Sequence, residues 1–258
     1  MATTSIAYAE TPLLAFTLAR ADDALVLGHR LSEWCGHAPM IEEDIALANI
    51  GLDLIGQARA LYDYAAQLEG TGLSEDHFAY LRDAGQYRNC LLVEQPNGDF
   101  AVTIARQFLY TAFADPWQRA MTGSTDATLA AIAGKAEKET AYHLRHAAEW
   151  LIRLGDGTQE SHARAQDAID GLWMYTGELF EAESSPRTLF DAGVAVDPAS
   201  LRAGWDTSVN DVLAQATLTR PKSGWMQSGG RAGRHSEYLS LMLTELQYLQ
   251  RSFPGAKW

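Results

Sequence analysis

The chain has 258 residues, of which 47% are hydrophobic and 21% are charged. This composition is typical of a globular protein that buries roughly 75% of its unfolded surface around an ordinary hydrophobic core. Twenty basic and thirty-three acidic residues give a formal net charge of −13. That balance argues against sequence-independent binding to nucleic acid or anionic lipid, because both ligands need a basic face. A local basic patch for a partner subunit or a coenzyme phosphate is still compatible with it.

The sequence has two cysteines, Cys35 and Cys90, and no Cys-x-x-Cys motif. They therefore provide neither a metal knuckle nor a disulfide framework. The segment at 1–14 carries an acid rather than bases and lacks an apolar h-region, so it is not typical of a signal peptide. No apolar run reaches the roughly 20 residues that span a bilayer. We therefore expect a cytoplasmic protein in a reducing setting, with neither a membrane nor a nucleic-acid partner.

Apolar residues recur at three- and four-residue spacing along most of the chain, which predicts helices. The second long helix begins with three acidic residues, which favour a helix N-terminus, and carries the apolar stripe Ile41, Ile45, Ala48, Leu52 and Ile55. Turn-forming residues separate the later helices. The four long helices are predicted over 13–34, 41–68, 100–121 and 127–154, and shorter ones over 74–84, 162–182, 198–218 and 236–252.

This order of elements indicates an all-α protein. Two long helical hairpins joined by a longer crossover are the pattern of a ferritin-like four-helix bundle. No stretch of the sequence is typical of an interdomain linker. We expect a single ferritin-like helical domain over 1–258, with the core bundle at about 13–154 and extra C-terminal accessory helices at about 158–252.

The glycine-rich segment GGRAG at 229–233 allows two interpretations. It is either an anion-binding nest with Arg231 and Arg234 alongside, or a turn before the helix that starts at Ser236. We favour the turn. The known phosphate-loop, dinucleotide-binding and nucleophile-elbow motifs are absent from the sequence.

Di-iron bundles of the ferritin-like class take a Glu from each of two helices and a Glu-x-x-His motif from each of the other two. We therefore examined the residue three positions before each of the seven histidines. None is Glu or Asp; in chain order they are Val26, Trp34, Ser74, Thr140, His143, Gln159 and Ala232. The helix predicted over 41–68 contains no histidine. The sequence therefore does not predict a regular di-iron centre.

Polar residues nevertheless interrupt the apolar stripes where metal ligands would lie in such a bundle. They are Asp22, Asp53, Gln107, Glu139 and His143. Asp22 and Asp23 are 100° apart on a helix, so either could be the inward carboxylate. These residues either gather an irregular metal site or form a hydrogen-bonded remnant of a lost site, since buried polar groups must be paired. We favour the remnant.

Four long strings carry a resemblance to a known family. They are LSEWCGHAPMIEEDIALANIGLDLIGQAR at 31–59, LLVEQPNGDFAVTIARQF at 91–108, GGRAGRHSEYL at 229–239 and TELQYLQRSFPGAKW at 244–258. Together they resemble the structural subunit of the bacterial phenylacetyl-CoA ring-1,2-epoxidase, a multicomponent monooxygenase of phenylacetate degradation.

The resemblance implies a non-catalytic chain that keeps the bundle, has lost the metal ligands and scaffolds a partner. The implied partners are a homologous ferritin-like catalytic subunit that holds the di-iron centre and the acyl-CoA, a small accessory subunit, and a reductase with flavin, an iron–sulfur cluster and NADPH. It implies no catalytic residue, metal or cofactor in this chain. Aromatic side chains are candidate interface anchors, namely Trp117, Trp173, Trp205, Trp225 and Trp258.

Two other hypotheses stay open. The chain could itself be a metal-dependent oxygenase with an irregular site around Glu139 and His143. It could also be an iron-storage or carrier bundle, although no sequence signal supports a cage. Whether the loop at Arg231–Arg234 contacts coenzyme A is equally open.

Overall fold

The computed structural model describes residues 5–182, 187–222 and 224–256. Within these ranges every regular element is a helix, which confirms the all-α prediction. The four long helices are α1 (Pro12–Ser32), α2 (Ile41–Glu69), α5 (Phe100–Met121) and α6 (Ala127–Gly155). Their bounds lie within two residues of the predicted ones. The shorter helices include α3 (Glu75–Tyr80), α4 (Leu91–Glu94), α7 (Gln159–Trp173), α8 (Arg187–Asp191), α9 (Arg202–Gln215), α10 (Glu237–Leu246) and α11 (Tyr248–Ser252).

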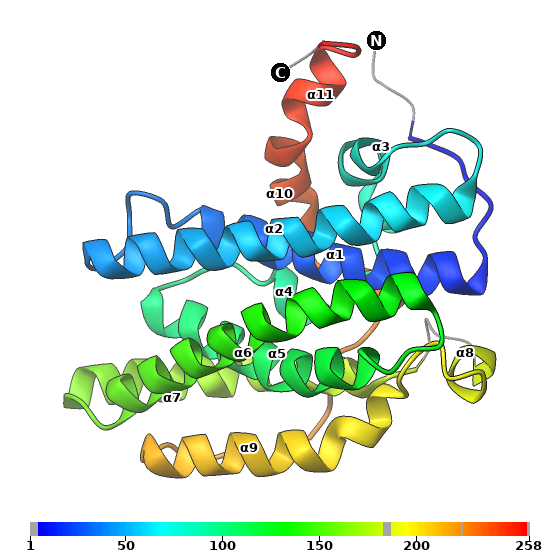
Figure 1. The fold of residues 1–258 in the computed structure, drawn as a ribbon. Helices are drawn as coiled ribbons and strands as arrows, with labels where there is room; N and C mark the ends of the chain where they lie inside the picture. The colour runs from blue at the N-terminus through cyan, green and yellow to red at the C-terminus, as the bar shows by residue number, and fades with distance from the viewer. Residues whose placement is uncertain (1–4, 183–186, 223, 257–258) are drawn as a thin grey trace.

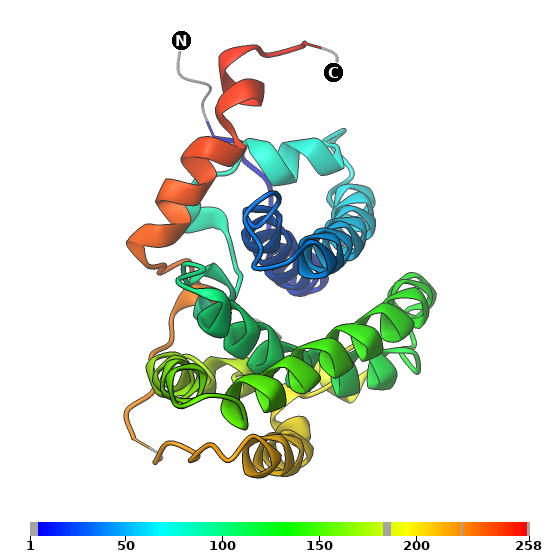
Figure 2. The ribbon, with the colours of Figure 1, turned by 90° about the vertical axis from the view of Figure 1, so that its left-hand side faces the viewer.

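The long helices form two antiparallel hairpins that pack on each other as a ferritin-like bundle (Figure 1). The view along the helices in Figure 2 shows the pair α1 and α2 above the pair α5 and α6. Helix α7 packs beside α5 and α6, and α9 lies on the side of that hairpin away from α1 and α2. Helices α10 and α11 stand across the outer side of the first hairpin.

Local chemistry explains where the long helices begin. Pro12 occupies the first turn of α1, where its missing N–H costs nothing, and Thr11 accepts a hydrogen bond from the Leu14 amide. Asp99 caps α5 through the Val102 amide at 3.0 Å, and Asp126 caps α6. Side-chain oxygens at these positions satisfy backbone donors that have no partner within the helix.

Two glycines let α1 and α2 approach closely. A Cβ atom added to Gly28 would lie 3.1 Å from the Gly51 carbonyl oxygen, and one added to Gly51 would lie 3.3 Å from the Gly28 carbonyl oxygen. Side chains at either position would push the backbones apart. The two helices of the first hairpin therefore pack closely in the half that is nearer to the turn at 33–40.

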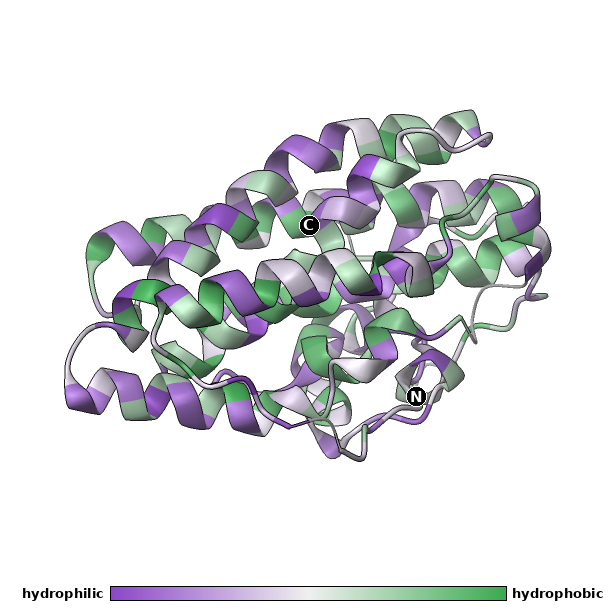
Figure 3. Cartoon of the chain, turned by 90° about the horizontal axis from the view of Figure 1, so that it is seen from below, coloured by the Kyte–Doolittle hydropathy of each residue, from purple (hydrophilic) through white to green (hydrophobic). Residues whose placement is uncertain are grey.

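Several sequence expectations need correction. The apolar stripe predicted on the second helix does not face the core, and its members Ile41 and Leu52 are 72% and 65% exposed. A second set of apolar residues on α2 is buried instead, namely Leu47, Ile50, Leu54, Ala58 and Leu61. The C-terminal helix is divided at Gln247, and α8 was not predicted. Figure 3 shows hydrophobic and hydrophilic residues interleaved along the helices.

The candidate tryptophan anchors are mostly core residues. Trp117, Trp173 and Trp205 are buried: the Trp117 ring packs against Phe16 of α1, and the Trp173 and Trp205 rings pack against each other. Trp225 is 74% exposed, and Trp258 lies outside the described residues. None of the described helices combines the length and apolar character needed to cross a bilayer.

Buried ion pairs tie distant segments to the middle of α1. Asp23 binds both terminal nitrogens of Arg231 at 2.8 and 2.7 Å, and its carboxylate also accepts a hydrogen bond from the Cys90 amide. Asp22 binds Arg82, and all four of these side chains are at most 1% exposed. The buried ion pair between Arg231 and Asp23 thus holds the segment before α10 against the first helix.

Replacement of Asp23 by alanine should therefore destabilise the fold strongly. It leaves the Arg231 guanidinium buried without its counter-charge, and breaking a buried pair in this way costs about 3–5 kcal/mol. Urea unfolding of Asp23→Ala measures the loss, with Asp211→Ala on the exposed face of α9 as the control, expected within about 0.5 kcal/mol of the wild type. A loss below about 1 kcal/mol in Asp23→Ala would contradict this role.

Candidate functional site

Polar side chains line the contact between α2 and α6. Three pairs cross this contact, and we call them the α2–α6 polar pairs. His143 Nε2 lies 3.0 Å from Asp53 Oδ2, and His146 Nε2 lies 2.8 Å from Glu43 Oε2. The Gln57 amide donates to Glu139 Oε2 at 2.9 Å. Each α6 group thus has its own partner on α2.

The environment of His143 favours the neutral ring. Its side chain is fully buried, and burial lowers the pKa of His143 below the usual value, against the opposing hydrogen bond and charge of Asp53. Asp53 itself is 39% exposed, so water weakens its pull on the proton. The ring nitrogens Nδ1 of His143 and His146 are buried and make no hydrogen bond with a described residue.

The predicted site residues do not all come together. Asp53 meets His143, and Glu139 lies on the same face of α6 one turn away. Asp22 is elsewhere: its carboxylate accepts hydrogen bonds from the Tyr62 hydroxyl at 2.5 Å and the Arg88 amide at 2.7 Å, besides pairing with Arg82.

Asp22 and Asp23 were the two candidates for an inward carboxylate on α1, and neither points to a metal site among the described residues. Asp22 and Asp23 are equally buried, and each is neutralised by an arginine rather than by a group of α6. Gln107 is also fully buried on α5, and its amide oxygen and nitrogen make no hydrogen bond with a described residue.

A metal ion needs several convergent donors. Among the described residues no group of three or more His, Cys, Asp or Glu side chains is placed to hold one. Of the candidate positions, Asp53, Glu139 and His143 are instead engaged in the α2–α6 polar pairs, and Asp22 is bound to an arginine. This donor set does not fit a di-iron centre.

The segment at 229–233 forms a nest whose anion is supplied by the chain itself. The backbone amides of Gly229 and Arg231 donate to Glu178 Oε1 at 2.9 and 3.1 Å, and the Leu91 amide donates to Glu178 Oε2 at 2.7 Å. The nest and turn interpretations thus both describe part of this loop. Arg231 is buried against Asp23, whereas Arg234 is exposed.

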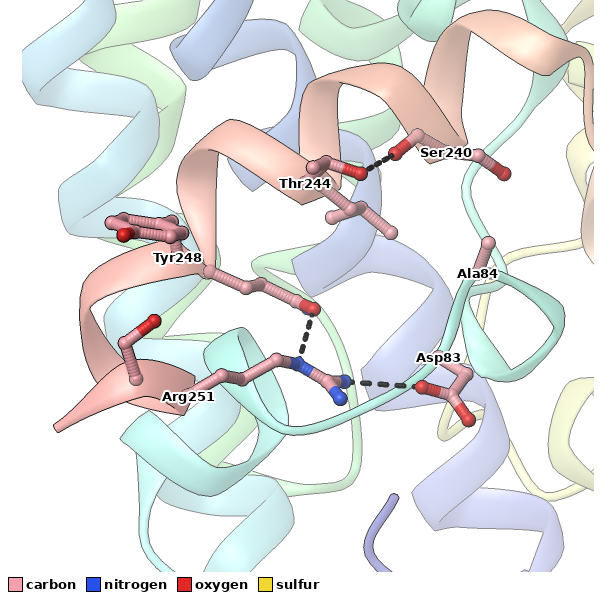
Figure 4. A pocket seen from close by; sticks show the side chains of 9 residues that line it. Asp83, Ala84, Ser240, Thr244, Tyr248 and Arg251 are labelled. Atoms are coloured by element: carbon pink, nitrogen blue, oxygen red, sulfur yellow. Dashed lines mark hydrogen bonds and ion pairs between the residues drawn. The ribbon is translucent and has the colours of Figure 1, made fainter. Parts of the chain in front are cut away.

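A hollow of about 390 Å³ lies between α10, α11 and the segment at Asp83 (Figure 4). Arg251 lies along it and donates to Gln247 Oε1 at 2.9 Å, to Asp83 Oδ1 at 3.1 Å and to the Arg82 carbonyl at 3.0 Å. These contacts dock α11 onto the segment that follows α3. The charged groups of the hollow are therefore used in holding the C-terminal helices.

An exposed apolar stripe lies on α2, whereas the sequence interpretation had counted it among the apolar stripes of the bundle. We call it the α2 stripe (Ile41, Ile45, Ala48, Leu52 and Ile55). Its four large members are between 37% and 72% exposed, and Met40 beside it is 45% exposed. The signal was present in the sequence, because α2 carries two apolar stripes and a helix at the edge of a bundle buries only one.

The burial of His143 predicts a pH dependence of stability. As the pH falls below about 6.5, His143 takes up a proton in the unfolded chain but not in the folded one, because its pKa is lowered by burial. Protonation therefore favours the unfolded state, and the free energy of unfolding decreases. On going from pH 7.5 to pH 5.5, the wild type should therefore lose more unfolding free energy than His143→Gln does. Urea unfolding at both pH values measures it, and the same comparison with His37→Gln, at an exposed site, controls for general acid effects. An unchanged difference for His143→Gln would contradict the prediction.

Comparison with known proteins identifies the family of this chain. The family described as Phenylacetic acid catabolic protein matches residues 1–258. The chain is 51% identical over 250 residues to one of the subunits of the 1,2-phenylacetyl-CoA epoxidase of Escherichia coli (strain K12), and the match covers 95% of this chain and 99% of that protein. The resemblance drawn from the four sequence strings is thereby confirmed. The chain belongs to the phenylacetic acid catabolic protein family.

Proposed function

We propose that this chain is the non-catalytic structural subunit of a phenylacetyl-CoA 1,2-epoxidase complex in aerobic phenylacetate degradation, and that it scaffolds a homologous di-iron catalytic subunit. The observation that carries the proposal is the pairwise use of the polar residues between α2 and α6, in a chain 51% identical to one of the subunits of such an epoxidase. On this proposal the chain contributes no catalytic residue and binds no metal or cofactor.

The physical basis of such a role is rigidity. A catalytic bundle must hold its ligands close to the productive geometry, and a second bundle packed alongside limits the movement of its helices and excludes water. The α2–α6 polar pairs and the buried arginine–aspartate pairs make this bundle suited to that task, because each polar group is fixed by a partner of the same chain.

The remaining parts of the complex follow from the same proposal. The di-iron centre and the acyl-CoA are held by the catalytic subunit, and the assembly also includes a small accessory subunit. Electrons come from NADPH through a reductase that carries flavin and an iron–sulfur cluster. The assembly works in the cytoplasm.

The alternative, a metal-dependent oxygenase with a site around Glu139 and His143, has one observation in its favour. The buried Nδ1 atom of His143 and the buried amide of Gln107 make no hydrogen bond with a described residue. Against it, Glu139 binds Gln57 and His143 binds Asp53, so the two side chains are directed to different partners on α2.

Metal analysis separates the two. The full chain is produced alone in iron-replete medium, its metal content is determined by mass spectrometry, and it is then mixed with the di-iron catalytic subunit and the reductase. We expect far less than one iron per chain, and phenylacetyl-CoA epoxidation that needs the mixture. Near-stoichiometric iron that disappears in His143→Ala would overturn the proposal, whereas Cys35→Ser, at an exposed position, controls for adventitious metal.

A further inference from the structure

The α2 stripe has the spacing of a coiled-coil seam. Ile41, Ile45, Ala48, Leu52 and Ile55 follow one another at intervals of four, three, four and three residues. The mean repeat of 3.5 residues keeps a row of side chains facing one partner helix along its whole length. Together with Met40, four of these residues are among the twelve large hydrophobic side chains that the described part of the chain exposes.

This surface is not part of the core of the chain. The opposite face of α2 buries Leu47, Ile50 and Leu54 against the bundle. A bundle helix normally presents charged and polar residues to water on its outer face. A continuous apolar row there marks a surface that another molecule covers.

A cavity extends the α2 stripe at its C-terminal end. It has a volume of about 290 Å³ and lies between α2 and α3, with Ile55, Arg59 and Tyr80 in its lining. Glu75, also in the lining, forms an ion pair with Arg59 at 3.5 Å. A large side chain from a helix lying on α2 can enter this cavity, as anchor residues do at protein interfaces.

The charges around the α2 stripe indicate the chemistry of its occupant. Glu42, Asp44, Glu75 and Asp76 lie at its two ends, and Arg59 is the basic residue among them. A helix that carries lysine or arginine beside its apolar row complements this acidic border. A second copy of this chain would bring the same acidic border and another net charge of −13, which disfavours self-association.

A second exposed apolar set on α10 and α11 is less suited to a helix. It includes Leu241, Tyr248 and Phe253, but α10 ends at Leu246 and α11 has only five residues. This break interrupts any continuous row. The 29-residue α2 offers the longer uninterrupted surface.

We propose that the α2 stripe and the cavity beside Ile55 are the docking surface for an amphipathic helix of the di-iron catalytic subunit, a helix with apolar residues at heptad spacing and basic residues at its flanks. This inference rests on the proposed function and adds the surface through which the scaffold acts. Leu52, the fourth of the five stripe residues and the one before Ile55 at the cavity, is the central contact.

Binding of the full chain to the purified catalytic subunit tests the proposal, with Leu52→Glu and Leu241→Glu as a matched pair. Both leucines are 65% exposed, so the two variants change charge and hydrophobicity equally and leave the core intact. We expect Leu52→Glu to raise the Kd at least about tenfold, as loss of a central interface residue does. Leu241→Glu should stay within about twofold of the wild type, and circular dichroism should show the same helix content and thermal midpoint in all three proteins.

A charge variant tests the chemistry of the occupant. Glu42→Lys should slow association with the catalytic subunit at low ionic strength, and the difference should shrink in high salt, because the border acts through screened electrostatic attraction. Faster association of Glu42→Lys would show an acidic occupant and overturn the assignment.

Three other outcomes would overturn the proposal. Leu52→Glu could bind as the wild type does, or Leu241→Glu could be the variant that loses binding. Alternatively, light scattering could show that the isolated wild type is a dimer that Leu52→Glu dissociates without loss of binding to the catalytic subunit, which would make a second copy the occupant. If the wild type itself fails to bind and to support epoxidation, the proposed function fails first and this inference with it.

Discussion

Asp22 and Asp23 stand side by side in the middle of α1, where neither carboxylate reaches water. Each is neutralised by a buried arginine from a distant segment: Arg82 follows α3, and Arg231 comes from the glycine-rich loop before α10. Two adjacent buried charges are tolerable only with such partners, because desolvation would otherwise exceed any gain. The same carboxylates also accept the amides of Arg88 and Cys90. The segment between the hairpins and the C-terminal helices is thus ordered around one point of α1.

The ion pair between Asp23 and Arg231 fixes the position of the glycine-rich loop at 229–233. Its backbone wraps the Glu178 carboxylate while Arg231 reaches α1, and Gly230 has no room for a side chain, since a Cβ atom there would lie 2.3 Å from the Asn89 carbonyl oxygen. The unusual sequence of this loop is therefore explained by internal contacts. The apolar stripe of α2 is directed outward, and none of these contacts covers it.

The extent to which the sequence predicts this structure differs between features. The long helices follow from apolar spacing and from caps such as Asp99 and Asp126, which act within a few residues. The partners of Asp22 and Asp23 lie 60 and 208 residues away, so no local pattern predicts that these acids leave the centre of the bundle. The two apolar stripes of α2 look alike in sequence, and only the packing of α1 and α6 decides which one is buried. Asp53 and His143 are both candidate site residues in the sequence, but their pairing depends on the register of α2 against α6, which is set by how the two hairpins pack.

The exposed apolar stripe and the polar pairs occupy opposite faces of the same helix, α2. Inside, Glu139, His143 and His146 of α6 are each paired with a side chain of α2, so the inner face of α2 fixes the position of α6. Outside, the same helix leaves a continuous apolar row in water, at a free-energy cost of roughly 25 cal/mol for each Å² that an occupant would cover. A helix held rigidly on one face and apolar on the other transmits the rigidity of its bundle directly to whatever packs against it, because no flexible loop intervenes. If the subunit acts by bracing a partner, α2 is therefore the helix that connects the paired interior of the bundle to the surface on which the partner packs.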